Sequence, residues 1–220
     1  MTTSLSSKTQ MYLGLGVLGA VGVLFLLRRK PSAPTTPGKA PGPGPSPAPI
    51  PARNLYTKEQ YPPLSPDAVA LFTSAAKYAG LPVEWASSVE LSNIMSKESN
   101  GWVGRPNYQF GEGSSASERA TWLMNHRERW PLIWDSIRRG TWRDMLAEPY
   151  RSKPAGEQSS ATGLGQLTWS NIRTGNFYPS GVEGIGNAFE EAIGMLRYIK
   201  QRYGSPQAAW AQYGKGHEGY

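Results

Sequence analysis

The sequence predicts that residues 67–220 form one mainly α-helical domain. Helix-capping residues bound several apolar runs, and within these runs the apolar positions recur every three or four residues, as on one face of a helix. No run alternates apolar and polar residues over the length of a strand. The roughly 154 residues of this part suffice for one compact core.

The first expected helix follows Ser65-Pro66-Asp67. A serine N-cap, a proline at the first helical position and an acid in the first turn are typical of a helix start. Gly80 is expected to end the helix, because glycine accepts the left-handed backbone that follows a last turn. The apolar repeat predicts six buried positions: Val69, Leu71, Phe72, Ala75, Ala76 and Ala79.

Two longer helices are expected further on. One opens at Leu81-Pro82 and runs to Ser99. The other follows Asn187, which together with Glu190 resembles a capping box, and it ends at Gly204. Its apolar face is predicted to be Ala188, Phe189, Ala192, Ile193, Leu196 and Ile199.

A membrane anchor is expected near the start of the chain. After a short segment at residues 1–10, residues 11–27 carry no charge, and as a helix they would rise about 25 Å, near the lower limit for spanning a bilayer. A cleaved signal peptide is the alternative. A signal peptide begins with a positively charged region, but only Lys8 carries such a charge here. The basic cluster Arg28-Arg29-Lys30 also stands where a small-residue cleavage site is expected, so we interpret the segment as an uncleaved anchor.

A linker is expected at residues 28–66. Nine prolines lie between residues 31 and 51, among Gly, Ala and Ser, and such a segment forms no core but reaches about 60 Å as an extended spacer. Proline-rich segments also serve as ligands of peptide-binding modules. The basic cluster after the anchor outweighs Lys8 before it, so the positive-inside rule places the C-terminal domain in the cytoplasm.

The distribution of charge argues against a nucleic-acid partner. The chain has a formal charge of +7, but residues 1–66 hold seven Lys/Arg and one acid, whereas residues 67–220 hold sixteen Lys/Arg and fifteen acids. The nearly neutral domain therefore offers no basic face for phosphates. There is no cysteine, and His126 and His217 have no metal-pair spacing, so neither a metal nor an organic cofactor is expected.

Glu98 is the candidate catalytic residue. It continues the helix face that Leu91 and Met95 bury, and Ser99-Asn100-Gly101 then ends the helix, so the carboxyl group is expected where the core opens toward a loop. Burial disfavours the charged form and raises the pKa of a carboxyl group, which suits a general acid. The alternatives are a surface glutamate at a frayed helix end, or a glutamate paired with Lys97 or Arg105.

Two further motifs accompany Glu98-Ser99. Residues 163–167, Gly-Leu-Gly-Gln-Leu, form a small loop that enters a helix near Thr168, and residues 210–216 read Trp-Ala-Gln-Tyr-Gly-Lys-Gly. In this order the three motifs resemble those of lytic transglycosylases of the goose-type-lysozyme-like fold. The residues of these motifs, with His-Glu-Gly-Tyr after the last one, are most like versions carried by bacteriophage virion and tail proteins.

The resemblance implies a function. The family cleaves the β-1,4 bond between N-acetylmuramic acid and N-acetylglucosamine in peptidoglycan and leaves a 1,6-anhydro sugar. It implies that Glu98 is first acid and then base, that Ser99 supports it as part of the substrate-binding set, and that Gln166 and Tyr213 line the cleft and contact substrate. The implied partners are glycan strands, the bilayer through residues 11–27, and virion proteins. The protein would be a single-pass protein of a virion membrane or of the host inner membrane.

The sequence departs from the family at two cleft positions and in spacing. Gly165 replaces the usual methionine and Gly214 the usual asparagine, and 64 residues separate Glu98 from Gly163. Residues 101–160 are therefore treated as an insertion, whose Trp122, Trp130 and Trp134 are expected in the core of inserted helices. Trp102 and Trp169 lie next to the motifs, and we expect them to bind sugar rings in the groove.

Two other functions remain open on the sequence. An inactive glycan-binding or structural virion protein could keep the fold, because the two glycines remove side chains from the cleft wall. A hydrolytic muramidase would need a second acid, for which Glu112 and Glu157 are the candidates.

Overall fold

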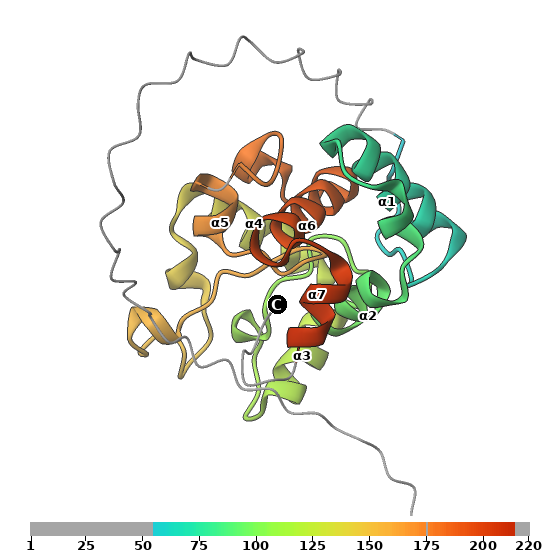
Figure 1. Cartoon of the computed structure of the whole chain (residues 1–220). Coiled ribbons are helices and arrows are strands. Elements are labelled where there is room, and N and C mark those ends of the chain that lie inside the picture. Colours follow the sequence, from blue (N-terminus) through green and yellow to red (C-terminus); the bar gives the residue numbers. More distant parts are fainter. Residues whose placement is uncertain (1–54, 175, 214–220) are drawn as a thin grey trace, which may run out of the picture.

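The computed structural model describes residues 55–174 and 176–213 (Figure 1). The predicted segment at residues 1–10, the anchor at residues 11–27 and most of the linker at residues 28–66 lie outside the described residues. Among the helices that are described, none combines the length and the apolar character needed to cross a membrane.

The described part of the chain is mainly helical, as predicted, and its extended pairing is limited to isolated bridges. The α-helices are α1 (Pro66–Ala79), α2 (Val89–Glu98), α3 (Ala116–Asn125), α4 (Trp130–Arg139), α5 (Trp169–Thr174), α6 (Ala188–Tyr203) and α7 (Pro206–Gln212). Short 3-10 turns lie at Val83–Ser87, Tyr108–Phe110, Arg127–Arg129, Trp142–Met145, Ala155–Glu157 and Gly181–Gly184.

The structure confirms the predicted ends of α1. The Ser65 side chain accepts a hydrogen bond from the Ala68 amide, and Gly80 ends the helix with a left-handed backbone. Two of the six predicted buried positions were wrong: Val69 and Ala79 are only partly buried, and Ala68 takes a core position instead. The buried face of α1 therefore begins at Ala68 and ends at Ala76.

The helix predicted from Leu81-Pro82 to Ser99 is two elements. A 3-10 turn at Val83–Ser87 precedes α2, and Ser88 lies between them with an extended backbone. The Ser88 side chain accepts a hydrogen bond from the Leu91 amide and so caps α2. A serine that caps a helix competes with continuation of the preceding turn, which is why the chain breaks there.

Helix α6 lies at the centre of the molecule, where it contacts α1 and α7 (Figure 1). All six of its predicted apolar positions are buried, and Asn187 and Gly204 cap it as predicted. The expected capping box is incomplete, however. The Glu190 carboxylate accepts hydrogen bonds from the amide and hydroxyl of Ser180, at 2.8 and 2.9 Å.

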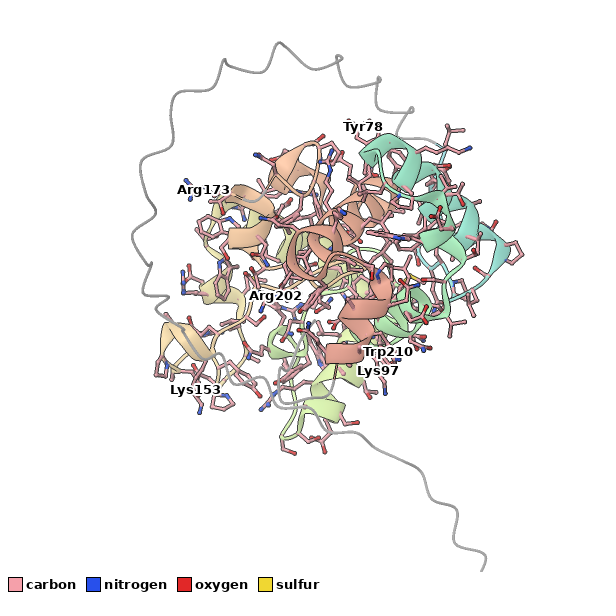
Figure 2. The ribbon with its side chains drawn as sticks, in the orientation of Figure 1. Tyr78, Lys97, Lys153, Arg173, Arg202 and Trp210 are labelled. Carbon is pink, nitrogen blue, oxygen red and sulfur yellow. The ribbon has the colours of Figure 1, made fainter. Side chains whose placement is uncertain are left out.

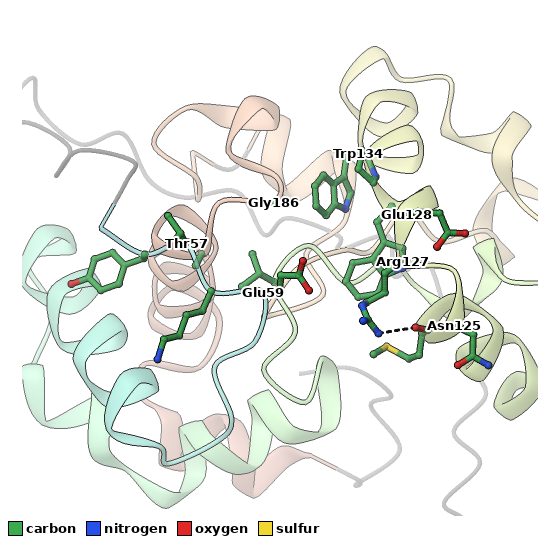
Figure 3. Close-up of a pocket in the computed structure, with 14 residues that line it drawn as sticks. Thr57, Glu59, Asn125, Arg127, Glu128, Trp134 and Gly186 are labelled. Carbon is green, nitrogen blue, oxygen red and sulfur yellow. Dashed lines mark hydrogen bonds between the residues drawn. The ribbon is translucent and has the colours of Figure 1, made fainter.

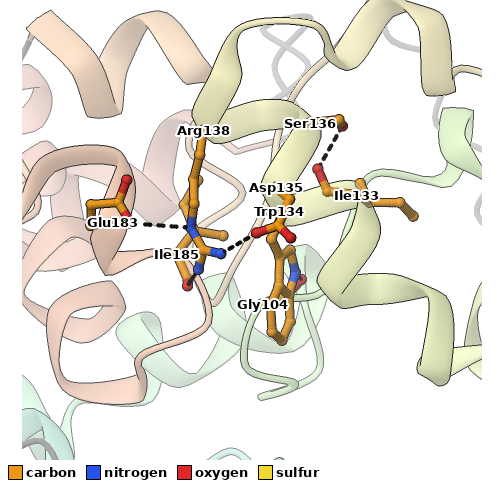
Figure 4. A network of polar contacts seen from close by, with 8 residues as sticks. All are labelled: Gly104, Ile133, Trp134, Asp135, Ser136, Arg138, Glu183 and Ile185. Carbon is orange, nitrogen blue, oxygen red and sulfur yellow. Dashed lines mark hydrogen bonds and ion pairs between the residues drawn. The ribbon is translucent and has the colours of Figure 1, made fainter.

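The insertion at residues 101–160 contributes most of a second hydrophobic core. Trp130 is buried there as predicted, whereas Trp122 and Trp134 are partly buried against the same core. Arg138 of α4 donates to the Ile185 carbonyl at 2.7 Å and pairs with Asp135 and Glu183 (Figure 4). These contacts join the insertion to the segment that precedes α6.

Candidate active site

A cleft of about 420 Å³ contains two of the three motif regions and Tyr213 of the third. The cleft walls are the end of α2, the inserted segment around residues 105–108, the loop at residues 159–168, the end of α6, and Tyr213 directly after α7. Lys97 of α2 and Trp210 of α7, labelled in Figure 2, mark two helices that contact each other at the cleft. The cleft is lined by Lys97, Glu98, Arg105, Pro106, Asn107, Tyr108, Ala116, Ala120, Ser159, Ala161, Gly165, Gln166, Leu167, Thr168, Asn171, Tyr198, Arg202 and Tyr213.

Glu98 is the last residue of α2 and its side chain is partly buried in this cleft. Burial raises the pKa of Glu98 from its ordinary value of 4.5 to about 7, although a hydrogen bond from Tyr213 opposes the rise. The Tyr213 hydroxyl donates to Glu98 Oε1 at 3.1 Å, and burial together with the Glu98 charge raises the pKa of Tyr213. A carboxyl group with this pKa can both give and accept a proton near neutral pH.

Ser99 holds the end of α2 against the second motif. Its side chain is 0% exposed, and its hydroxyl donates to the Leu164 carbonyl at 2.9 Å while accepting from the Gly101 amide at 3.1 Å. Ser99 does not line the cleft in the structure, so its expected contact with substrate stays a prediction. Its contacts fit the supporting role that the resemblance implies.

Gln166 lines the cleft, as expected. Its side-chain amide nitrogen donates to the Arg105 carbonyl at 2.7 Å and to the Gly163 carbonyl at 3.1 Å. The residue also has a positive φ of 46°, a strained region for a non-glycine residue. These bonds fix the loop of the second motif to the start of the insertion.

The two tryptophans expected in the groove lie elsewhere. Trp102 packs edge-on against Trp130 at 6.2 Å, with Arg127 over its ring at 4.9 Å. Trp169 packs into the second core, with Arg173 over its ring at 4.8 Å. Neither lines the Glu98 cleft, because both rings turn toward the apolar contacts of the second core.

No second acid lines the cleft among the described residues. Glu112 lies 4.0 Å from Arg129, and Glu157 pairs with Lys153 at 3.0 Å, both on exposed surfaces. The cleft instead contains the cations Lys97, Arg105 and Arg202. Burial lowers the pKa of Arg105.

Several residues that were not assigned to the cleft from the sequence also line it. Arg105 and Tyr108 come from the insertion, and Arg202 comes from the last turn of α6. The aromatic content of the insertion was a signal, but it did not distinguish Tyr108 from the tryptophans, which pack in the core. Glu190 and Glu191 are buried acids within an otherwise apolar helix face, and only Glu190 was interpreted from the sequence, as part of a cap.

A larger hollow of about 730 Å³ lies apart from the cleft (Figure 3). It lies between residues 56–59, residues 124–134 and the start of α6, and no residue lines both cavities. It contains none of the motif residues.

Within residues 55–174 and 176–213, no three His, Cys, Asp or Glu side chains lie together as a metal site would require. Comparison of the chain with protein-family models, with curated proteins and with solved structures finds no match. The site is thus defined by its own geometry: among the described residues, one carboxylic acid of raised pKa lies in a cleft with both polar and apolar lining residues.

Proposed function

We propose that this protein is a peptidoglycan lytic transglycosylase, anchored in a membrane through residues 11–27, and that it belongs to a phage virion and aids penetration of the cell wall. The resemblance of the three motifs suggests the substrate and the phage. The charge asymmetry around the anchor fits this setting, because a domain made on the cytoplasmic side stays away from the wall until a virion delivers it.

The observation that carries the proposal is the isolation of Glu98. It is the only acid among the described residues that line the cleft, and burial raises its pKa to about 7. Most glycoside hydrolases need two carboxylates, one on each side of the bond that breaks. A reaction that uses one carboxyl group twice fits this cleft better.

In the proposed reaction, protonated Glu98 gives its proton to the glycosidic oxygen as the bond to the muramoyl C1 breaks. The resulting carboxylate then takes the proton of the C6 hydroxyl, whose oxygen bonds to C1 and closes the 1,6-anhydro ring. No water is consumed, and Glu98 ends the cycle protonated. Between the two proton transfers Glu98 is a carboxylate, and the hydrogen bond from Tyr213 to Oε1 stabilises that charged form.

The test is digestion of purified sacculi with the full-length chain in detergent, followed by mass spectrometry of the products. We expect 1,6-anhydromuramoyl ends. Glu98→Gln should lower turnover by about 10²- to 10⁴-fold, the usual contribution of general acid-base catalysis. The matched control is Glu90→Gln, because Glu90 is a partly buried acid on the same helix that does not line the cleft, and it should retain normal turnover.

Three outcomes would contradict parts of the proposal. Reducing muramoyl ends as the main product would transfer the function to a hydrolase. Binding of glycan strands without any product would favour the inactive glycan-binding virion protein. Equal turnover of Glu98→Gln and Glu90→Gln would show that Glu98 is not the catalytic acid.

A further inference from the structure

A second buried carboxylate lies behind the wall of the cleft. Glu191 of α6 is 0% exposed and accepts three backbone hydrogen bonds. The amides of Gly104 and Leu164 donate to Oε2 at 2.9 and 3.0 Å, and the amide of Gly186 donates to Oε1 at 2.8 Å. One side chain thus fixes three segments that are far apart in the sequence.

Two of these segments form the cleft. Gly104 directly precedes Arg105, which lines it, and Leu164 lies within the loop that contributes Gly165 and Gln166. The Arg105 carbonyl accepts hydrogen bonds from the Gly163 amide at 3.0 Å and from Gln166 at 2.7 Å, so the two segments are also bonded to each other. Glu191 holds this pair of segments from the core side.

The contact continues to the turn that follows Glu98. The Leu164 amide donates to the Glu191 carboxylate, and the Leu164 carbonyl accepts from the Ser99 hydroxyl, so Leu164 connects α6 to the end of α2. A shift of Leu164 would therefore be felt by Ser99 and by the neighbouring Glu98.

The fit around Glu191 is tight. A Cβ atom added at Gly163 would lie 2.7 Å from the Glu191 carboxyl carbon and 2.9 Å from the Tyr178 hydroxyl oxygen. The charged and titratable groups that face Glu191 are the Glu190 carboxylate and the Tyr178 phenol. Burial raises the pKa of Glu191 to about 7, and the three backbone hydrogen bonds oppose that rise because they stabilise the charged form.

We propose that Glu191 is a positioning residue for the cleft, which through Leu164 and Gly104 keeps the wall closed around Glu98. The expected effect on turnover rests on the proposed function, but the effect of Glu191 on the cleft wall can be measured without substrate, by hydrogen exchange and by the pKa of Glu98. Burial is the main cause of the raised pKa of Glu98, so a wall that loosens and admits water must lower that pKa.

The chain offers a matched pair of variants, Glu191→Gln and Glu190→Gln. Both residues are 0% exposed neighbours on α6, but Glu190 bonds Ser180, which does not line the cleft. In Glu191→Gln an amide nitrogen, itself a donor, must face at least one backbone N–H that now binds a carboxylate oxygen. Comparison of the two variants separates the general effect of removing a buried carboxylate from the specific effect on the wall.

Three measurements on the full-length chain test the proposal. Hydrogen exchange at the Leu164 and Gly104 amides should be at least about tenfold faster in Glu191→Gln than in Glu190→Gln, at matched melting temperature. The pKa of Glu98, followed by carbon NMR of its carboxyl group, should fall from about 7 toward 4.5 only in Glu191→Gln. Turnover of soluble glycan strands should fall about tenfold in kcat in the same variant alone.

Unchanged exchange and an unchanged pKa of Glu98 in Glu191→Gln would overturn the proposal. Equal changes in the two variants would do the same, because they would reduce Glu191 to a purely structural residue. Absence of turnover in the wild-type chain would instead refute the proposed function, and the exchange and titration results would still decide the role of Glu191.

Discussion

The hydrogen bond from Tyr213 to Glu98 should control the pH at which the protein works. In Tyr213→Phe the hydroxyl is lost, while the ring that stacks on Trp210 at 5.2 Å is kept. The bond lowers the pKa of Glu98 against the effect of burial, so its loss should raise that pKa further above about 7. A general acid must be protonated, and the alkaline limb of the turnover profile should therefore move to higher pH.

The size of the shift follows from the geometry. A hydrogen bond to a charged group contributes roughly 1.5–3 kcal/mol, and about 1.4 kcal/mol corresponds to one pKa unit, so the upper limit is about one to two units. The Tyr213–Glu98 distance of 3.1 Å is long for a charge-assisted bond. We therefore expect a shift of about 0.5 to 1 unit.

The same change should affect stability with a defined sign. The pKa of folded Glu98 lies above its ordinary value of 4.5, so the folded chain holds a proton that the unfolded chain releases. Stability from this group is present below about pH 4.5 and declines as the pH rises through about 7. In Tyr213→Phe the decline should extend to higher pH by the same 0.5 to 1 unit, or about 1 kcal/mol.

The assay is a turnover profile from pH 5 to 9 on soluble glycan strands, with carbon NMR titration of Glu98 beside it. Tyr108→Phe is the control, because Tyr108 lines the same cleft without entering the causes of the Glu98 shift. An alkaline limb that stays in place, or moves to lower pH, would refute the reasoning. A lower plateau with the expected limb would mean that Tyr213 also contacts substrate.

Two further variants test the supports of the site. Ser99→Ala removes the bond to Leu164 and leaves a buried carbonyl without that donor, so it should destabilise the fold by about 1–3 kcal/mol, measured by denaturant unfolding. It should also lower kcat more than it changes KM in steady-state kinetics, and a normal kcat would contradict the role of Ser99 in supporting Glu98. Gly163→Ala combines a backbone φ of 82° with a clash against Glu191 and should destabilise by about 2–4 kcal/mol. Gly80→Ala is its control, since φ is 66° but the space is open, and an equal loss in both variants would show that the clash is relieved.

Local chemistry determined the helices that the sequence predicted correctly. Ser65 and Gly80 bound α1, and Asn187 and Gly204 bound α6, because a cap depends only on side chains and amides within about four residues of it. Where two local signals competed, the prediction was wrong. Ser88 can continue a turn or cap the next helix, and the structure has it capping α2.

The sequence also placed Glu98 correctly at the end of a buried helix face. Helical periodicity is enough for that result, because it depends only on residues within two turns. Its partner Tyr213 and the loop that contains Gln166 were found by their motif resemblance, and the structure brings both to the same cleft.

Only the tertiary structure decided which other side chains face the cleft. Trp102, Trp169 and Tyr108 are all aromatic residues near motifs or in the insertion, yet only Tyr108 lines the cleft, because the second core takes both tryptophan rings. The Ser99–Leu164 bond spans 65 positions and the Gly104–Glu191 bond spans 87. Such contacts depend on how distant segments cross in space, and no pattern within one helix or loop encodes that crossing. The sequence by itself therefore determined the ends of α1 and α6 and the place of Glu98 on its helix, and the packing of the two cores decided the walls around that residue.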